Sequence, residues 1–167
     1  TFDSASGFSG QFSTTFVVDT ANKQEGVGSL KTSFGQPTAE AAGSKIGGMI
    51  YYDFTSPVDL SAAQQFALSY YTPAKINGST ALQVNFITNG NDDGYNFTLA
   101  IDDAAAGWHT LTFNKANPSA TANNPNWASI NRIRITYFNL SNNAEPTYML
   151  LDNLKVEKIG VPLSYHN

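Results

Sequence analysis

The sequence predicts an all-β protein, a sandwich of two antiparallel sheets folded as a jelly roll. Three observations favour this fold class. Segments with apolar residues at every second position recur along the whole chain, and this period is typical of half-buried strands. The stretches between them are rich in Gly, Pro and Asn, which favour turns. No stretch keeps the i, i+3, i+4 apolar spacing of a helix.

Each predicted strand alternates apolar and polar residues between turn signals. In chain order the strands are Phe12–Asp19, Leu30–Phe34, Met49–Phe54, Phe66–Tyr71, Leu82–Ile87, Tyr95–Ile101, Trp108–Phe113, Arg132–Phe138 and Tyr148–Val156. This number of strands closes into two packed sheets. Asn89–Gly94 contains two glycines, which supply the positive φ of a tight reversal, so we expect a hairpin here.

The composition fits one domain with few charges. The chain has 167 residues, and charged residues are 13% of it, about half the usual share. The net charge of -4 gives no basic footprint, so we expect neither a nucleic acid nor a membrane as partner. The absence of cysteine excludes thiol catalysis and disulfides. We expect one domain over residues 1–160, with 161–167 as a tail or the start of a linker.

Four of the predicted strands define a candidate binding face. We expect the strands that begin at Met49, Leu82, Tyr95 and Arg132 to share one sheet. Their inward residues are apolar, namely Leu82, Val84, Phe86, Phe97, Leu99, Ile133 and Ile135. Their outward residues are mostly amides, hydroxyls and rings, namely Tyr51, Asp53, Gln83, Asn85, Asn96, Thr98, Arg132, Arg134, Thr136 and Phe138. Such groups suit sugar hydroxyls and the apolar faces of sugar rings; the alternative is a merely neutral sheet surface.

The two arginines of the chain, Arg132 and Arg134, are two residues apart in one strand and face the same side. A guanidinium recognises a carboxylate through two hydrogen bonds. The arginines therefore indicate either an acidic polysaccharide as ligand or ion pairs with Asp53 or Glu145 that only hold the sheet.

Trp127 lies in the Asn-rich loop before Arg132, where it forms either a plug at the end of the sandwich or an exposed platform for a sugar.

Several short motifs, in this order, resemble the jelly-roll carbohydrate-binding modules of polysaccharide-degrading enzymes. The motifs are Phe2-Asp3, Glu25–Lys31, Phe66-x-Leu68-x-Tyr70, Trp108-x-x-Leu111-x-Phe113, Ile133-x-Ile135 and Leu151–Val156. The resemblance covers nearly the whole chain and assigns no particular family. It implies glycan binding on a concave sheet or at loop tips, a secreted or cell-surface location, and a monomeric module attached to a larger chain. It also implies a position in the core for Trp108, which opens a predicted strand.

The resemblance also implies one structural calcium ion. Asp3 and Asp152 match its carboxylate ligands in strands that pair in many jelly rolls, with Lys23 and Glu25 as further carbonyl or carboxylate donors. The alternative is a pair of surface aspartates. A second candidate, Asn89-x-Asn91-x-Asp93-Gly94, resembles half of an EF-hand loop, but Ala100 replaces its final Glu. We therefore interpret that segment as a turn.

We expect a non-catalytic module that targets an attached glycoside hydrolase or lyase to a polysaccharide, with acidic polysaccharides among the candidates. Glycoside hydrolysis needs two carboxylates, and Asp53 is the single acid on the predicted face. Two alternatives stay open: a structural or adhesion sandwich of a secreted enzyme, and a polysaccharide lyase that uses Tyr51 as base beside Arg134 and Gln83. The sequence does not identify the polysaccharide or whether binding occurs at chain ends.

Overall fold

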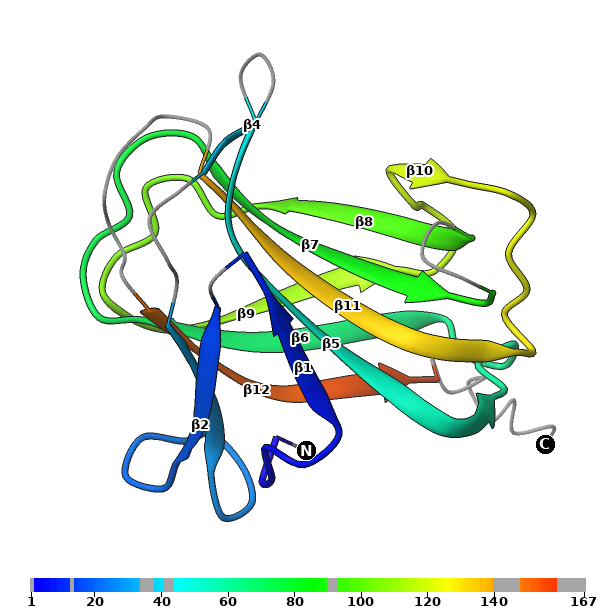
Figure 1. The fold of residues 1–167 in the computed structure, drawn as a ribbon, viewed down its shortest axis with the longest axis horizontal. Coiled ribbons are helices and arrows are strands. Elements are labelled where there is room, and N and C mark those ends of the chain that lie inside the picture. The colour runs from blue at the N-terminus through cyan, green and yellow to red at the C-terminus, as the bar shows by residue number, and fades with distance from the viewer. Residues whose placement is uncertain are drawn as a thin grey trace, which may run out of the picture.

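The computed structural model describes residues 2–12, 14–33, 38–40, 44–89, 93–139 and 148–158. In this part of the chain, twelve strands form two antiparallel sheets that pack face to face (Figure 1). The predicted all-β sandwich is therefore confirmed.

The sheet in front in Figure 1, which we call sheet A, has the strand order β1-β5-β11-β7-β8-β10, and β4 also pairs with β5. Its strands are β1 (Phe8–Gln11), β4 (Thr38–Glu40), β5 (Ser44–Val58), β7 (Thr80–Ile87), β8 (Gly94–Ala100), β10 (Ala120–Thr121) and β11 (Ile130–Asn139). The four strands expected to share a sheet, β5, β11, β7 and β8, are consecutive neighbours in it.

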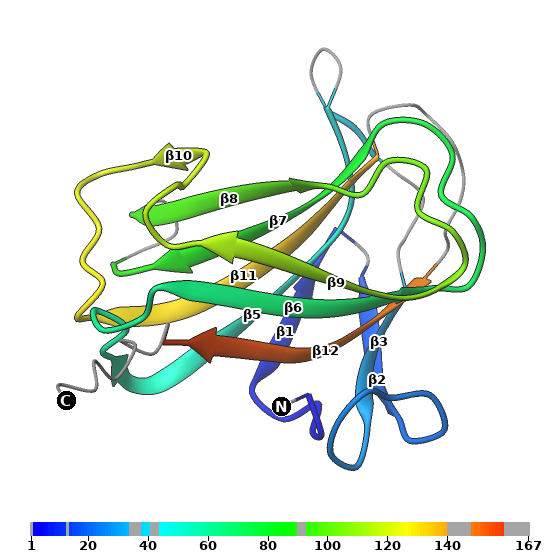
Figure 2. The same ribbon diagram turned by 180° about the vertical axis from the view of Figure 1, so that it is seen from behind.

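The second sheet, sheet B, has the order β2-β3-β12-β6-β9 and lies in front in Figure 2. Its strands are β2 (Thr15–Asp19), β3 (Ser29–Ser33), β6 (Gln65–Thr72), β9 (Gly107–Asn114) and β12 (Tyr148–Glu157).

Alternate residues of the facing strands fill the space between the sheets. Phe66 of sheet B stacks on Phe86 of sheet A with 4.5 Å between ring centroids. All the predicted inward residues of sheet A belong to this core or pack against it, because period-two alternation assigns one face of each strand to the interior. The core thereby fixes which side chains lie on the outer face of sheet A.

The predicted strand Phe12–Asp19 is shorter in the structure. β2 spans Thr15–Asp19 in sheet B, and a separate strand, β1, ends at Gln11 in sheet A. Between them Phe12 has φ of 56°, and the Thr14 amide donates a 3.2 Å hydrogen bond to the carbonyl of Gln11. The chain therefore turns at a position that carries no Gly or Pro signal.

The hairpin of β7 and β8 is confirmed by its antiparallel register. Gly90 lies outside the described residues, and Gly94 starts β8 without a positive φ. A Cβ atom there would lie 3.0 Å from the Phe86 carbonyl oxygen, so a close approach explains this glycine. Glu145 and the expected tail, residues 161–167, also lie outside the described residues.

Candidate functional site

The strand register aligns the predicted site residues in two rows across the outer face of sheet A. In the first row Arg134 lies opposite Tyr51 on one side and Asn85 on the other, and Asn85 lies opposite Asn96. Directly opposed residues point to the same side of a sheet. These four side chains, from four strands, therefore share one face.

The second row and the ends of the face hold the other predicted residues. Thr136 lies opposite Gln83, and Gln83 opposite Thr98. Arg132 lies opposite Asp53, and Phe138 lies opposite Ala81. The alternation expected from the sequence thus places these residues together, and their contact with a glycan stays a prediction.

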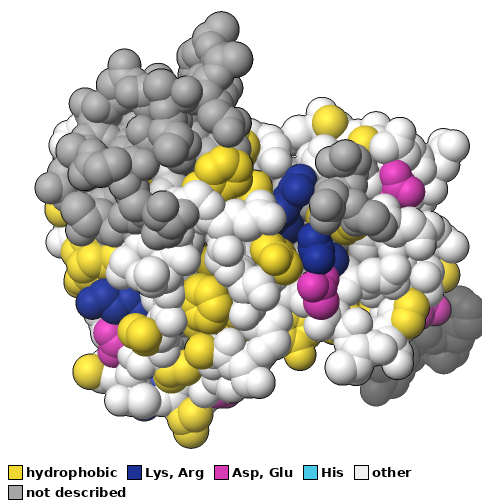
Figure 3. Space-filling model, in the orientation of Figure 1, with side chains coloured by type: hydrophobic (Ala, Val, Ile, Leu, Met, Phe, Trp, Pro, Cys, Tyr) yellow, Lys and Arg dark blue, Asp and Glu magenta, His cyan; other side chains and the backbone are white. Residues whose placement is uncertain are grey.

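An ion pair and a ring form the charged centre of this face. Arg132 donates hydrogen bonds from Nε to Asp53 Oδ1 at 2.5 Å and from Nη2 to Oδ2 at 2.9 Å. Its guanidinium carbon lies 4.2 Å from the ring centroid of Tyr51. Figure 3 shows basic and acidic side chains next to each other near the middle of the face. Arg132 therefore joins the carboxylate of Asp53 to the ring of Tyr51.

Hydrogen bonding to Asp53 raises the pKa of Arg132 above its ordinary value, so the guanidinium keeps its charge. The side chain of Arg132 is 22% exposed, whereas that of Asp53 is 54% exposed. Of the two interpretations of the arginines, the ion pair with Asp53 is therefore observed for Arg132. Arg134 is partly buried between Tyr51 and Asn85 in the register.

Amides and hydroxyls form the rest of the face and are held by one another. Gln83 Nε2 donates to Thr98 Oγ1 at 3.1 Å, and the Asn85 amide donates to Asn96 Oδ1. The backbone of Thr98 donates to Ser119 Oγ at 3.0 Å. Side chains that are already oriented lose less conformational entropy when a ligand binds. This arrangement is suited to a ligand rich in hydroxyl groups.

Two polar side chains form the floor of the face. Asn85 and Thr136 are each 1% exposed. Asn85 Oδ1 and Thr136 Oγ1 are buried, and the described residues give them no hydrogen-bond partner. A ligand on this face would therefore contact the more exposed neighbours of these two side chains, such as Tyr51, Gln83 and Thr98.

β1 adds two side chains to this face that sequence reasoning missed. Ser9 lies opposite Tyr51, and Gln11 lies opposite Met49. They were missed because the sequence analysis predicted no strand before Phe12. Gly10 lies beside the turn, and an added Cβ there would lie 2.5 Å from the Thr14 carbonyl oxygen.

Trp127 does not join the predicted face. Its ring stacks on Tyr95 at 4.0 Å with an interplanar angle of 8°, and its centroid is 5.7 Å from that of Phe66. Lys115 Nζ lies 5.3 Å from its ring centroid. Of the two expectations for Trp127, the plug at the end of the sandwich is the position observed.

Trp108 was expected in the core, and this expectation is wrong. Trp108 lies opposite Tyr71 across β9 and β6, on the outer face of sheet B, with 5.6 Å between ring centroids. Its indole Nε1 donates to Asn22 Oδ1 at 3.0 Å. Leu111 and Phe113, at odd spacings from it, pack inward, so period-two alternation itself requires Trp108 to face outward.

Asp3 and Asp152, the predicted calcium ligands, both contact the loop between β2 and β3. Asp152 is fully buried, and its Oδ2 accepts hydrogen bonds from the amides of Gln24 at 2.8 Å and Glu25 at 3.0 Å. Asp3 Oδ1 accepts two from the amides of residues 27 and 28, at 2.6 and 2.9 Å. Gly26 has φ of 65°, and a Cβ there would lie 2.4 Å from both oxygens of Asp3.

This arrangement fits a calcium ion in part. The two carboxylates supply the hard oxygens that calcium prefers, but the loop presents amide hydrogens to them. Glu25 forms an ion pair with Lys155 at 3.3 Å, and Lys23 Nζ donates to the Thr20 carbonyl at 3.1 Å. Among the described residues, no group of three or more His, Asp or Glu side chains is placed to hold a metal.

The strand pairing that accompanied the calcium expectation is not found. Residues 2–7 belong to no strand, and β12 pairs with β3 and β6. Asp3 therefore reaches the loop from an irregular segment.

No protein-family model matches this sequence, and no curated protein sequence matches it either. Solved structures do resemble its fold. The fold is similar to a carbohydrate-binding module, CBM28, specific for non-crystalline cellulose, with 12% identity and a TM-score of 0.61 over 86% of this chain and 82% of that one. It is also similar to a family 11 module from Clostridium thermocellum in complex with a β-1,3-1,4-mixed-linked tetrasaccharide, with 12% identity and a TM-score of 0.58 over 90% and 86%.

Larger enzymes contain the same fold. An arabinose-bound α-L-arabinofuranosidase matches with 15% identity and a TM-score of 0.59 over 89% of this chain, which spans 22% of that chain. The resemblance to jelly-roll carbohydrate-binding modules is thus confirmed for the fold, and no family of modules is assigned.

Proposed function

We propose that this domain is a non-catalytic carbohydrate-binding module. It binds a polysaccharide on the outer face of sheet A, which serves as a concave binding surface. The observation that carries the proposal is the Tyr51 ring held by Arg132 beside the Arg134, Asn85 and Asn96 row. A fixed aromatic ring suits the apolar face of a sugar. The amides and hydroxyls around it suit the sugar's hydroxyl groups.

The proposed ligand presents sugar rings to Tyr51 and, where it contains uronates, a carboxylate to Arg134. Arg132 is a poor receptor for a further carboxylate because two of its hydrogen bonds go to Asp53. Among the described side chains of this face, Arg134 is the other cation, and it lies in the same row as Tyr51. Binding to acidic polysaccharides should therefore depend on Arg134.

The single predicted carboxylate of the face supports a binding role without hydrolysis. Enzymes that hydrolyse a glycosidic bond use a pair of carboxylates, one on each side of the bond. On the described outer face of sheet A, Asp53 is the one acid among the predicted residues, and it is paired with Arg132. The position of Tyr51 opposite Arg134 is the observation that favours the alternative of a polysaccharide lyase. A lyase would generate the absorbance of an unsaturated uronate, and we expect no such absorbance.

The proposal includes an attached catalytic domain, a secreted or cell-surface location and a monomeric state. The arabinofuranosidase shows this fold inside a larger chain. No described helix has the length and apolar character needed to cross a membrane. We also propose one structural calcium ion held by Asp3 and Asp152, with Glu25 and the carbonyl of Lys23 as further oxygen donors.

Affinity electrophoresis tests the proposed function with two matched variants. Tyr51→Ala removes a ring from the proposed face, and Tyr71→Ala removes one from the outer face of sheet B. On gels with mixed-linked β-glucan or polygalacturonate, Tyr51→Ala should be retarded less than the wild type. Its affinity should fall by about tenfold or more, which corresponds to about 1.4 kcal/mol of binding free energy. Tyr71→Ala should migrate like the wild type. Equal effects of both variants, or a wild type that no polysaccharide retards, would contradict the proposal.

A further inference from the structure

The connection between β6 and β7 contains an Asn-Gly pair, Asn77-Gly78, whose asparagine is exposed. Hydrogen bonds anchor the connection on either side of this pair. The Ile76 amide donates to the Ala104 carbonyl at 2.8 Å. The Thr80 amide donates to Asp102 Oδ1 at 2.6 Å. Figure 1 shows this connection at the left end of the sandwich, beside the connection between β8 and β9.

Gly78 places an unhindered main-chain nitrogen next to the side chain of Asn77. Gly78 has φ of 83°, in the left-handed region that favours glycine, and it has no Cβ that would shield its nitrogen. Among the described residues, its amide donates no backbone hydrogen bond. The Gly78 nitrogen is therefore suited to attack the amide carbon of Asn77, which is the first step of deamidation.

The other described asparagines are less suited to deamidation. Asn117 and Asn124 precede proline, whose nitrogen carries no hydrogen. Asn85 lies within β7 and is 1% exposed. The remaining described asparagines precede residues larger than glycine, apart from Asn89. The glycine that follows Asn89 lies outside the described residues.

We propose that Asn77 is a site of spontaneous deamidation, with water as the co-reactant. The Gly78 nitrogen forms a bond to Cγ of Asn77 and loses its proton, and the side-chain amide nitrogen leaves as ammonia. Water then opens the resulting succinimide ring at either carbonyl. Opening at Cγ gives aspartate. Opening at the main-chain carbonyl gives isoaspartate, in which the main chain runs through the former side chain.

Both products change the connection between β6 and β7. Each adds a negative charge to a chain whose formal net charge is -4. Isoaspartate also lengthens the main chain by a methylene group between the anchors at Ile76 and Thr80. Since these hydrogen bonds fix both ends of the segment, isoaspartate should strain them and lower the Tm.

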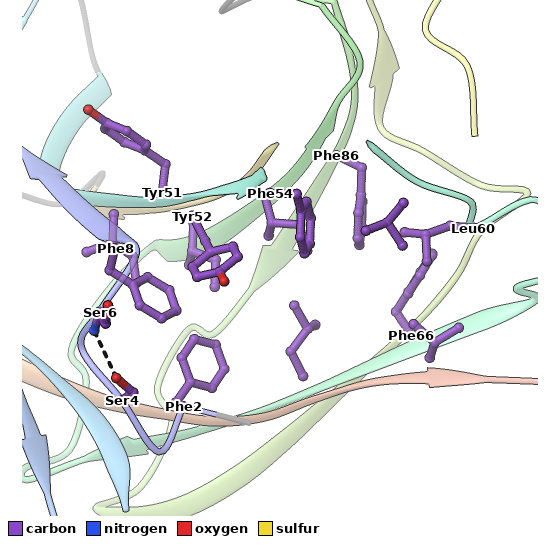
Figure 4. Close-up of a pocket in the computed structure, with 16 residues that line it drawn as sticks. Phe2, Ser4, Ser6, Phe8, Tyr51, Tyr52, Phe54, Leu60, Phe66 and Phe86 are labelled. Atoms are coloured by element: carbon purple, nitrogen blue, oxygen red, sulfur yellow. Dashed lines mark hydrogen bonds between the residues drawn. The ribbon is translucent and has the colours of Figure 1, made fainter. Parts of the chain in front are cut away.

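The proposed modification site lies apart from the binding face and from the interior. Figure 4 shows side chains of both sheets around an apolar cavity of about 420 Å³. None of residues 73–79 lines this cavity, and none belongs to a strand of sheet A. Deamidation at Asn77 should therefore leave the affinity for polysaccharide unchanged.

Peptide mapping by mass spectrometry tests the proposal on the whole domain, incubated at mildly alkaline pH. Digestion with chymotrypsin separates Asn77 from Asn89, because Leu82 and Phe86 lie between them. The free peptide Ala-Lys-Ile-Asn-Gly-Ser-Thr, which repeats residues 74–80, gives the rate without the fold. Asn77 in the domain should react within about tenfold of this rate, which corresponds to a local opening free energy below about 1.4 kcal/mol.

Two variants, each combined with Asn89→Gln, separate the chemistry from its effect on stability. Asn77→Gln keeps an amide but places it one methylene further from the main chain, so an isoaspartyl methyltransferase should label its fragment far less than that of Asn77. Asn77→Asp carries the new charge without the longer main chain and should keep the Tm of the fresh parent. The aged parent should lose about 2 °C or more.

The proposal is overturned if Asn77 stays intact in the domain while the free peptide reacts. It is also overturned if Asn77→Gln gains the isoaspartate label in this fragment as fast as the parent. Isoaspartate at Asn77 with an unchanged Tm would contradict the role given to the anchors at Ile76 and Thr80.

Discussion

Arg132 donates two hydrogen bonds to Asp53, at 2.5 and 2.9 Å, in the middle of the face that the sequence predicts for binding. The same guanidinium covers the ring of Tyr51. The pair therefore neutralises one cation of the face and fixes one of its rings.

Replacing Asp53 should make the face prefer acidic ligands. Asp53→Asn removes one negative charge and releases Arg132 from its ion pair. We expect affinity for polygalacturonate to rise by roughly two- to fivefold at low salt, since an exposed charge pair contributes about 0.2–1 kcal/mol. Affinity electrophoresis at two salt concentrations measures this, because added salt should cancel the gain. An unchanged affinity would show that Arg132 does not meet the ligand's charge.

Replacing Arg134 should have the opposite effect. Arg134→Ala should weaken binding to polygalacturonate by about tenfold or more, which corresponds to about 1.4 kcal/mol, with a Tm close to that of the wild type. Lys31→Ala is the matched control, since it removes a cation from the outer face of sheet B. Wild-type affinity in the Arg134 variant would remove this residue from the site.

Chelation tests the proposed calcium ion. If Asp3 and Asp152 hold an ion that binds the native state alone, EGTA should lower the Tm and calcium should restore it. Free calcium at one hundred times its dissociation constant adds about 2.7 kcal/mol of stability. A melting curve that EGTA leaves unchanged would mean that the amide contacts to Asp3 and Asp152 hold this loop without a metal.

Truncating Trp127 should affect stability and leave binding intact. Its ring packs on Tyr95, Phe66 and Phe86, so Trp127→Ala should destabilise the domain by about 3 kcal/mol or more. Urea unfolding measures this loss. The folded protein should retain its affinity for polysaccharide, and a large loss of affinity at unchanged stability would instead identify Trp127 as a ligand contact.

Much of the fold and of the face could be predicted because alternation has a fixed period. The inward positions of β7, such as Val84 and Phe86, also determine that Gln83 and Asn85 face outward. Alternation does not reveal where a strand changes sheets, so the turn at Phe12 and the contribution of β1 were missed.

The ion-pair partner of Arg132 also could not be predicted from the sequence. The sequence left Arg132 with a ligand carboxylate, Asp53 or Glu145, and the β5–β11 register places Asp53 directly opposite it. Trp108 shows a different limit. Its expected core position came from the resemblance, and the spacing from Leu111 and Phe113 contradicts it.

The central claim, that the outer face of sheet A binds polysaccharide, is tested most directly by backbone amide NMR spectra recorded during titration with a soluble glycan that the domain retains on gels. The largest shift changes should occur at Tyr51, Asn96 and Arg134, which lie in one row across β5, β11, β7 and β8. Changes centred on Tyr71 and Trp108, on the outer face of sheet B, would contradict the account.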